Sequence, residues 1–271
     1  MRSAAPKRNQ VVAVTGAASG IGWAICREYA RRGAGIALLD VDAEGVHRRA
    51  QALNRQGVRC LALACDVARE GACNDAIGDI LEAFGGIDVL VNNAGITQRG
   101  AFALTRSAVF RRVMDINFFG SLYCTKAALD SLIERRGTIV VIESLAGVTP
   151  LLGRSGYCAS KHALHGLFTT LRVELKPAGV HVLIACPGFV ETNLQTRALG
   201  EDGRVTPHPQ STVGRPWTPE KVAAAVVRAA ERRKNLLVLS SAGVLGYWIH
   251  RLAPGFYERL MAGKFQRELQ R

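Results

Sequence analysis

The chain has 271 residues, of which 48% are hydrophobic and 21% are charged. That length fits one large α/β domain with a sizeable core, and that composition excludes a disordered chain. The net charge of +13 favours anionic ligands. Because the basic residues are scattered as Arg doublets and no reader motif occurs, we expect no nucleic-acid partner.

Cysteine usage and the lack of targeting segments indicate a cytoplasmic protein. The chain has seven cysteines, an odd number, and no C-x-x-C pair, which favours a reducing compartment. Residues 1–10 are polar and basic without an apolar signal region, and no apolar run is long enough to span a bilayer. His162 and His165 are three residues apart but have no second pair, so we expect helix residues and no metal site.

A glycine-rich turn follows the first predicted strand, residues 10–15, and opens a predicted helix over residues 23–32. The turn, residues 16–22, reads G-x-x-x-G-x-G. Such a turn lets the backbone approach a pyrophosphate, which the N-terminus of the helix then binds. Glycines of this kind also form plain turns, but the flanking strand and helix favour cofactor binding.

Asp40 ends the second predicted strand, residues 36–40, about twenty residues after the glycines. A carboxylate there can accept both hydroxyls of an adenosine ribose and repels a 2′-phosphate, so the sequence predicts NAD over NADP. The alternative is an N-cap for a helix beginning at Ala43, which Asp42 could fill equally well.

The middle of the chain continues the alternation of strands and helices. The predicted strands are residues 60–67, ending in a carboxylate, and 87–95, ending in Asn-Asn-Ala-Gly. The predicted helices are residues 72–84 and a long helical stretch, residues 111–133. Asn117 lies in the middle of that long helix, where Asn is mildly unfavourable.

Tyr157 and Lys161 stand four residues apart on a predicted helix, residues 157–175, so their side chains share one face. A lysine cation favours the phenolate and lowers the phenol pKa, which makes the pair a proton donor and acceptor for an alcohol or carbonyl. Ser144 ends the preceding predicted strand, residues 137–144, at the edge of a parallel sheet where ligands bind. The Tyr/Lys spacing alone is a weak signal.

The last third of the predicted domain holds two more strands, residues 180–186 and 236–240, and a helix over residues 220–232. Between them, residues 189–217 form a long polar loop rich in Gly and Pro, and loops of that length are often lids. No repeat or linker occurs, so the chain reads as one domain.

Several short motifs in one order resemble the short-chain dehydrogenase/reductase family. They are Thr15-Gly16-x-x-x-Gly20-x-Gly22, Asp66, Asn92-Asn93-Ala94-Gly95, Asn117, Ser144, Tyr157-x-x-x-Lys161 and Pro187-Gly188. The resemblance covers residues 10–192 and implies a Rossmann-like, doubly wound parallel sheet of about seven strands with a bound nicotinamide cofactor. By resemblance, the cofactor-binding residues are Gly16, Ser19, Gly20, Ile21 and Gly22 at the pyrophosphate, Asp40 at the ribose, Asp66 and Val67 at the adenine, Asn93, Ala94 and Gly95 along the cofactor, and Pro187, Gly188, Val190 and Thr192 at the nicotinamide, with Tyr157 and Lys161.

The same resemblance implies four catalytic residues. Tyr157 is the general acid and base, Lys161 lowers its pKa and holds the nicotinamide ribose, and Ser144 bonds the substrate oxygen. Asn117, at a helix irregularity, keeps a water in a proton path behind Lys161. The sequence departs from the family at Glu143, where many relatives have a small residue. This carboxylate either alters the proton network or points outward.

A basic amphipathic tail, residues 242–271, follows the catalytic domain, residues 1–241. Its apolar and aromatic residues recur at helical intervals among arginines and lysines, and Pro254-Gly255 divides it into two helices. We expect these helices to cover the substrate mouth or pack on a second subunit; the alternative is that they lie on an anionic membrane surface. Either arrangement suggests a lipophilic substrate, as in relatives that act on steroids, retinoids or fatty-acyl chains.

The sequence therefore predicts an NAD(H)-dependent oxidoreductase for a lipophilic secondary alcohol or ketone. Two alternatives are a 3-oxoacyl-thioester reductase and a non-catalytic scaffold that senses a cofactor or binds a membrane peripherally. Asp40 and the tail argue against the first, and the Ser/Tyr/Lys set argues against the second. Family resemblance implies a homodimer or homotetramer formed through the helices around Asn117 and Tyr157.

Overall fold

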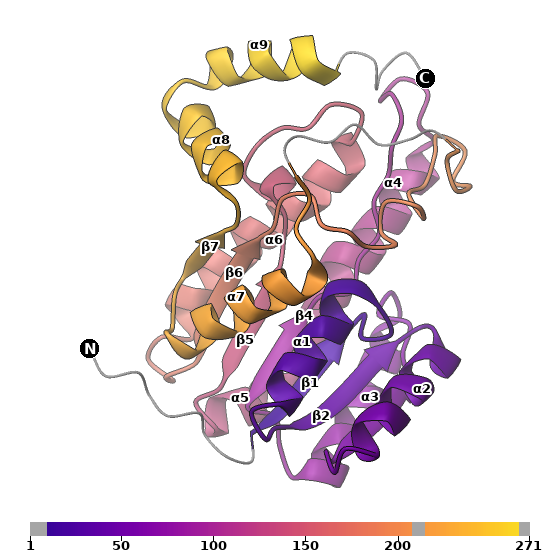
Figure 1. Cartoon of the computed structure of the whole chain (residues 1–271), viewed down its shortest axis with the longest axis vertical. Helices are drawn as coiled ribbons and strands as arrows, with labels where there is room; N and C mark the ends of the chain where they lie inside the picture. The colour runs from indigo at the N-terminus through magenta and orange to yellow at the C-terminus, as the bar shows by residue number, and fades with distance from the viewer. Residues whose placement is uncertain (1–9, 208–214, 266–271) are drawn as a thin grey trace.

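The computed structural model describes residues 10–207 and 215–265. Within them, seven parallel strands form one sheet in the order β3-β2-β1-β4-β5-β6-β7 (Figure 1). The strands are β1 (Val11–Thr15), β2 (Gly35–Asp40), β3 (Cys60–Ala64), β4 (Val89–Asn92), β5 (Thr138–Ile142), β6 (His181–Cys186) and β7 (Leu236–Val238). The strand order reverses between β1 and β4, and a crevice for ligands forms at such a switch point. The predicted Rossmann-like sheet is confirmed.

The central strands are apolar because both faces of the sheet are covered. Every residue of β1, β4 and β6 is buried. Alternate residues enter different cores: Val12 and Val14 pack in one, and Val11 and Ala13 in the other. This double burial explains the near-continuous runs of Val, Ile and Leu.

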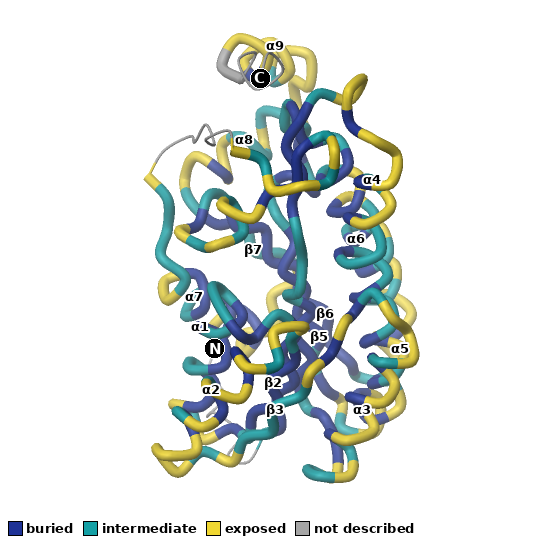
Figure 2. The backbone as a smooth tube through the Cα atoms, turned by 90° about the vertical axis from the view of Figure 1, so that its right-hand side faces the viewer, coloured by how far each residue is buried: buried dark blue, intermediate teal, exposed yellow. Residues whose placement is uncertain are grey.

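Helices cover the two faces in separate groups (Figure 2). One group consists of α1 (Gly20–Ala30), α2 (Ala43–Asn54) and α7 (Pro219–Glu231). The other consists of α3 (Glu70–Phe84), α5 (Gly120–Glu134) and α6 (Ser155–Glu174), with α4 (Ser107–Met114) packed beside α6. All connections therefore run between parallel strands through helices, as the alternating pattern predicts.

The long helical stretch predicted over residues 111–133 is present, with an irregularity in its middle. The segment is α4, then a π-helical turn over Asp115–Phe119, and then α5. Asn117 lies in that turn, and both polar atoms of its side chain bond to Ile96, on the loop after β4. A π-turn redirects the side chains it contains, and here Asn117 points to the loop after β4 and to α6.

Four predicted strands, residues 60–67, 87–95, 137–144 and 236–240, end earlier than expected, and after two of them a side chain bonds the backbone. The third strand ends at Ala64, and Asp66 then accepts a hydrogen bond from the main-chain N–H of Ala68, which starts a turn. The seventh strand ends at Val238, and Ser240 caps the next helix by accepting from the N–H of Gly243 at 3.0 Å. Such local bonds compete with sheet pairing.

Two helices, α8 (Ser241–Leu252) and α9 (Pro254–Phe265), extend from the end of the molecule where the strands finish (Figure 1). Their division at Pro254 is the predicted one. Arg267 and Arg271 of the predicted basic face lie outside the described residues. None of the described helices combines the length and apolarity that a bilayer crossing requires.

Candidate active site

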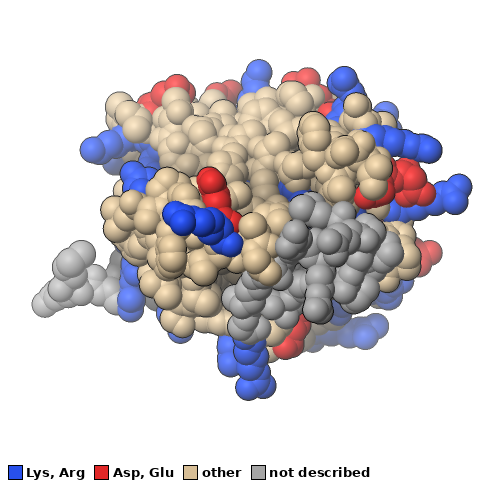
Figure 3. Space-filling view, turned by 90° about the horizontal axis from the view of Figure 1, so that it is seen from above, with Lys and Arg blue, Asp and Glu red and all other residues tan. Residues whose placement is uncertain are grey.

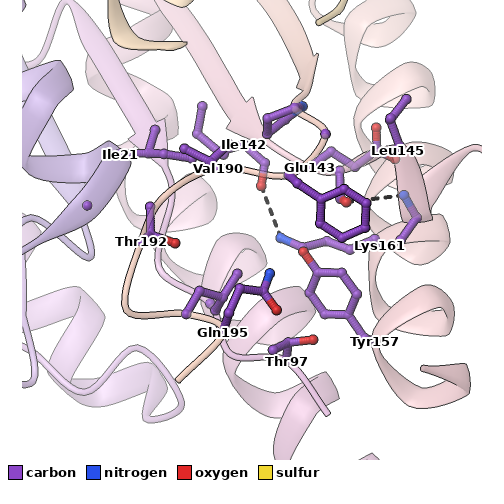
Figure 4. A pocket seen from close by; sticks show the side chains of 18 of the residues that line it. Ile21, Thr97, Ile142, Glu143, Leu145, Tyr157, Lys161, Val190, Thr192 and Gln195 are labelled. Atoms are coloured by element: carbon purple, nitrogen blue, oxygen red, sulfur yellow. Dashed lines mark hydrogen bonds between the residues drawn. The ribbon is translucent and has the colours of Figure 1, made fainter. Parts of the chain in front are cut away.

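One cavity of about 620 Å³ lies at the carboxyl ends of the strands, and its lining includes Asp40 on β2 and Tyr157 on α6. Figure 4 shows the part of it around Tyr157. It brings together residues from almost every predicted motif. The predicted residues that line it are Gly16, Ser19, Gly20, Ile21, Asp40, Asp66, Val67, Asn93, Ala94, Gly95, Ser144, Tyr157, Lys161, Pro187, Gly188, Val190 and Thr192. Gly22 and Asn117 do not line it; they lie beneath its wall.

The glycine turn after β1 is packed too tightly for side chains. Gly16 has a positive φ of 67°, and a Cβ on Gly22 would lie 2.2 Å from the main-chain oxygen of Gly16. Asn93 fixes the turn from below, because its Nδ2 donates to the oxygens of Thr15 (2.9 Å) and Gly16 (3.2 Å). Ser19, the N-cap of α1, makes no side-chain cap bond. The main-chain N–H groups at the start of the helix could therefore bind a ligand such as phosphate.

The two carboxylates after β2 have different partners. Asp40 accepts from the N–H of Ala18 (3.0 Å) and from the N–H of Asp42 (3.1 Å), and it lines the cavity. Asp42 accepts from the N–H of Gly45 (2.9 Å) and so caps α2. The predicted N-cap is therefore present at Asp42, and both carboxylates line the cavity.

Asn117 is fully buried and supports the cavity from behind. Its Oδ1 accepts from the N–H of Ile96 (2.8 Å), and its Nδ2 donates to the oxygen of Ile96 (3.0 Å) and to the hydroxyl of Ser160 (2.9 Å). These bonds join the loop after β4 to α6. The predicted water path behind Lys161 stays a prediction.

Ser144 and Tyr157 form the centre of the site. Ser144 caps the short 3₁₀ turn η2 (Leu145–Gly147) by accepting from the N–H of Ala146 at 3.1 Å. Burial raises the pKa of Tyr157 to about 12, while a hydrogen bond with Ser144 and the charge of Arg154 oppose that rise. The phenol is therefore protonated near neutral pH.

Lys161 stands beside Tyr157, whose pKa is nevertheless raised and not lowered as the spacing predicted. Its Nζ donates to the main-chain oxygen of Ile142 (3.0 Å) and lies 5.7 Å from the centre of the Tyr157 ring (Figure 4). Burial lowers the pKa of Lys161 itself to about 8, against the opposing charge of Glu143. Desolvation thus outweighs the attraction that the spacing suggested.

Glu143 points inward, so the alternative that it points outward is wrong. Its side chain has no exposed area and bonds to His165 on α6. His162, the other residue of the His pair, is exposed and bonds the oxygen of Cys158. No group of three His, Cys, Asp or Glu within residues 10–207 and 215–265 is arranged to hold a metal ion.

The end of the cavity beyond Tyr157 is mainly apolar and was only partly predicted. Its lining includes Leu145, Leu151, Leu194, Leu245, Ile249, Leu260 and Met261. Arg154, three residues before Tyr157, also lines the cavity; it is buried and donates to the hydroxyl of Thr97. Sequence reasoning missed Arg154, because a single Arg before a helix carries no pattern.

Comparisons of the sequence with known proteins identify a family and relatives. Residues 10–202 match the family model described as "short chain dehydrogenase". The chain is 37% identical over 276 residues to "Dehydrogenase/reductase SDR family member 7B" of Xenopus tropicalis, covering 99% of this chain and 89% of the relative.

Two solved structures are similar over most of their length. A short-chain dehydrogenase/reductase from Burkholderia phymatum, in complex with NAD, has a TM-score of 0.82 at 23% identity and covers 93% of this chain and 96% of its own. An alcohol dehydrogenase from Thermococcus sibiricus, complexed with 5-hydroxy-NADP, has a TM-score of 0.73 at 28% identity and covers 85% of this chain and 94% of its own.

Proposed function

The chain belongs to the short-chain dehydrogenase/reductase family, and we propose that it moves a hydride between NAD(H) and a lipophilic secondary alcohol or its ketone. One observation carries the proposal. Ser144, Tyr157 and Lys161 line the same cavity as Asp40 and the glycine turn. A dinucleotide held at the turn would therefore reach the phenol.

The described residues fit a nicotinamide dinucleotide. The glycine turn has no room for a Cβ at Gly22, and the N-terminus of α1 is open beside it. Asp40 already has its carboxylate fixed beside the turn, where it would accept the adenosine ribose hydroxyls and repel a 2′-phosphate. NAD preference rests on this residue, because the similar structures bind cofactors of both types.

The proposed mechanism divides the work between protein and cofactor. When bound, the nicotinamide supplies or accepts the hydride. Tyr157 donates its phenolic proton to the carbonyl oxygen during reduction and removes the proton from the alcohol during oxidation. Ser144 bonds the same substrate oxygen, and Lys161 places a positive charge beside the phenol. Burial keeps water from competing for these bonds.

A lipophilic substrate is supported by the walls of the cavity. Leucine, isoleucine and methionine side chains from η2, the loop after β6, α8 and α9 surround the end beyond Tyr157. Apolar walls with a few polar groups at one end are typical of pockets for apolar ligands. An alcohol or ketone buried there would present its oxygen to Ser144 and Tyr157.

We also propose that α8 and α9 lie on a membrane surface. Leu245, Trp248, Leu252, Phe256 and Leu260 are each at least half exposed. Seen from this end, residues other than Lys, Arg, Asp and Glu cover much of the described face, and most of the charged residues lie around it (Figure 3). Leu245 and Leu260 also line the cavity, so the same helices would connect an apolar surface with the substrate end.

The test is oxidation of a panel of hydrophobic secondary alcohols with NAD, followed by absorbance of NADH, in wild type and Tyr157→Phe. The variant should bind NADH as tightly as wild type and lose about 10²–10⁴-fold in turnover. Undiminished turnover would exclude the proposed role of Tyr157. Turnover of 3-oxoacyl thioesters with NADPH alone would favour the reductase alternative, and cofactor binding without any turnover would favour the scaffold.

Two further expectations remain proposals. A homodimer or homotetramer would form through α5 and α6, and light scattering of the full chain would measure its mass. The cytoplasmic location rests on cysteine usage, and all seven cysteines are free thiols in the structure.

A further inference from the structure

A carboxylate lies buried directly after the strand that contacts the catalytic lysine. Glu143 follows the last residue of β5, and its side chain has no exposed area. Glu143 follows Ile139 and Val141 by an even number of residues, so its side chain points to the same face of the sheet as theirs. That face is the one covered by α6. The N–H of Glu143 donates to the oxygen of Ala185 (2.9 Å), so this orientation is fixed by the sheet.

The carboxylate of Glu143 has two hydrogen-bonding side chains beside it and a glycine that leaves room for it. Nδ1 of His165 lies 3.1 Å from Oε1 and 3.3 Å from Oε2, and Sγ of Cys186 donates to Oε2 at 2.9 Å. Gly147 completes the site, because a Cβ there would lie 2.2 Å from Oε1. A buried carboxylate requires such partners, since an unpaired one is strongly disfavoured.

His165 connects this carboxylate with the surface of α6. Its side chain is 33% exposed, whereas Cys186 is fully buried. His165 also follows Lys161 by four residues, as Lys161 follows Tyr157, so the three side chains project from the same side of the helix.

The charge of Glu143 acts on both proposed catalytic groups. Burial lowers the pKa of Lys161, and Glu143 is the main group that opposes this. Glu143 also raises the pKa of Tyr157. The titratable or charged groups around it are Lys161, Tyr157, His165 and Cys158 on α6, Arg154 at its N-cap, and Cys186 on β6; η2 carries none.

We propose that Glu143, held by His165, is a positioning residue that keeps Lys161 charged and links the ionisation of the Lys161–Tyr157 pair to the surface of α6. The ammonium of Lys161 donates to the uncharged oxygen of Ile142, and the groups that offset its burial are Glu143, the larger influence, and Cys186. Burial disfavours the charged form of a lysine, and a nearby carboxylate offsets that effect. The part played by Lys161 in turnover rests on the proposed function; the effect of Glu143 on its charge does not.

The direct test is a nuclear magnetic resonance titration of Lys161. The chain has seven lysines, so the signal of Lys161 in protein with ¹³C-labelled lysine is assigned by its loss in Lys161→Met. In Glu143→Gln, which keeps the shape and removes the charge, the pKa of Lys161 should fall by about one unit or more. An unchanged pKa in a folded variant would overturn the proposal.

A matched pair of variants at His165 tests the second half of the proposal. His165→Asn keeps a donor near the position of Nδ1, and His165→Leu removes it. We expect the lysine pKa to stay at the wild-type value in the first and to fall in the second. Equal values in both would contradict the role of His165. Since His165 is partly exposed, these variants also decide the matter if Glu143→Gln fails to fold.

Kinetics then separate this inference from the proposed function. If alcohol oxidation is found, its pH profile should move to lower pH in Glu143→Gln and His165→Leu, because the pKa values of Lys161 and Tyr157 both fall. A merely structural role would lower the rate at every pH without moving the profile. If no oxidation is found in wild type, the proposed function fails while the lysine titration still decides the role of Glu143.

Discussion

The carboxylate of Asp40 accepts a hydrogen bond from the main-chain N–H of Ala18 at 3.0 Å, which joins the end of β2 to the glycine turn after β1. Asp40 is thus held in place beside the turn by protein contacts alone. In the proposed function, its charge would repel the 2′-phosphate of NADP.

Asp40→Ser should shift the cofactor preference towards NADP. Removing the carboxylate removes the repulsion, so the ratio of NADPH to NADH affinity should rise at least about tenfold, equivalent to about 1.4 kcal/mol. Fluorescence titration of both cofactors measures the ratio. Asp42→Asn is the control, because it removes a neighbouring charge and keeps the N-cap of α2; a ratio that moves equally in both variants would refute the role of Asp40.

Alcohol oxidation and ketone reduction should depend on pH in different ways. Burial raises the pKa of Tyr157 to about 12, so the phenol needed for reduction is present at neutral pH and the phenolate needed for oxidation is scarce. Oxidation should therefore accelerate from pH 7 to 10, by up to about tenfold per unit, whereas reduction should not accelerate. Initial rates in both directions check this, and an oxidation rate that is flat above pH 7 would count against it.

Lys161→Met should stabilise the protein near neutral pH. Burial lowers the pKa of Lys161 from 10.5 to about 8, so the folded state binds its proton less tightly than the unfolded state does. Below about pH 8 this costs about 3 kcal/mol, and the cost disappears as the pH rises towards 10.5. The advantage of the variant in urea unfolding should shrink by about 1 kcal/mol between pH 8 and pH 9; an advantage that grows with pH would contradict the assignment.

Gly147→Ala should destabilise the wild-type protein and be tolerated once Glu143 is shortened. The added methyl would lie 2.2 Å from Oε1 of Glu143. We expect a loss of about 1–3 kcal/mol in unfolding free energy, and a smaller loss in a Glu143→Ala background. A double-mutant cycle measures the difference, and full additivity would show that the two side chains do not compete for this space.

Vesicle binding should depend on the apolar face of α8 and α9. Replacing Trp248, Leu252 and Phe256 by Ser should weaken binding to vesicles containing an anionic phospholipid by at least about tenfold. Val173→Ser on α6 is the matched control, because Val173 is 71% exposed but lies on another element. Equal sedimentation of the two proteins with vesicles would remove these helices from membrane binding.

Most of the sheet could be predicted because its strands are buried on both faces and so appear as short apolar runs. The π-turn at Asn117 could not, since its cause is a contact with Ile96 from another part of the chain. The helical pattern of residues 107–134 continues through it without a break. The resemblance to a family suggested an irregularity there, which the residue pattern alone does not.

The candidate site was predictable as a set of residues, but its energetics were not. Spacing placed Tyr157 and Lys161 on one face of α6, yet the direction of the tyrosine pKa depends on how deeply the fold buries it. The partner of Glu143 was also hidden, because His165 is 22 residues away and no local pattern links the two. Burial and pairing across elements become visible only when the elements are assembled.

The close contact between Gly147 and Glu143 has an evolutionary consequence. A lineage that acquires a carboxylate after this strand must already have a residue without a side chain four positions later. Among natural relatives, Glu at the position of Glu143 should therefore occur together with Gly at the position of Gly147. A small residue at the position of Glu143 should leave the position of Gly147 free to vary.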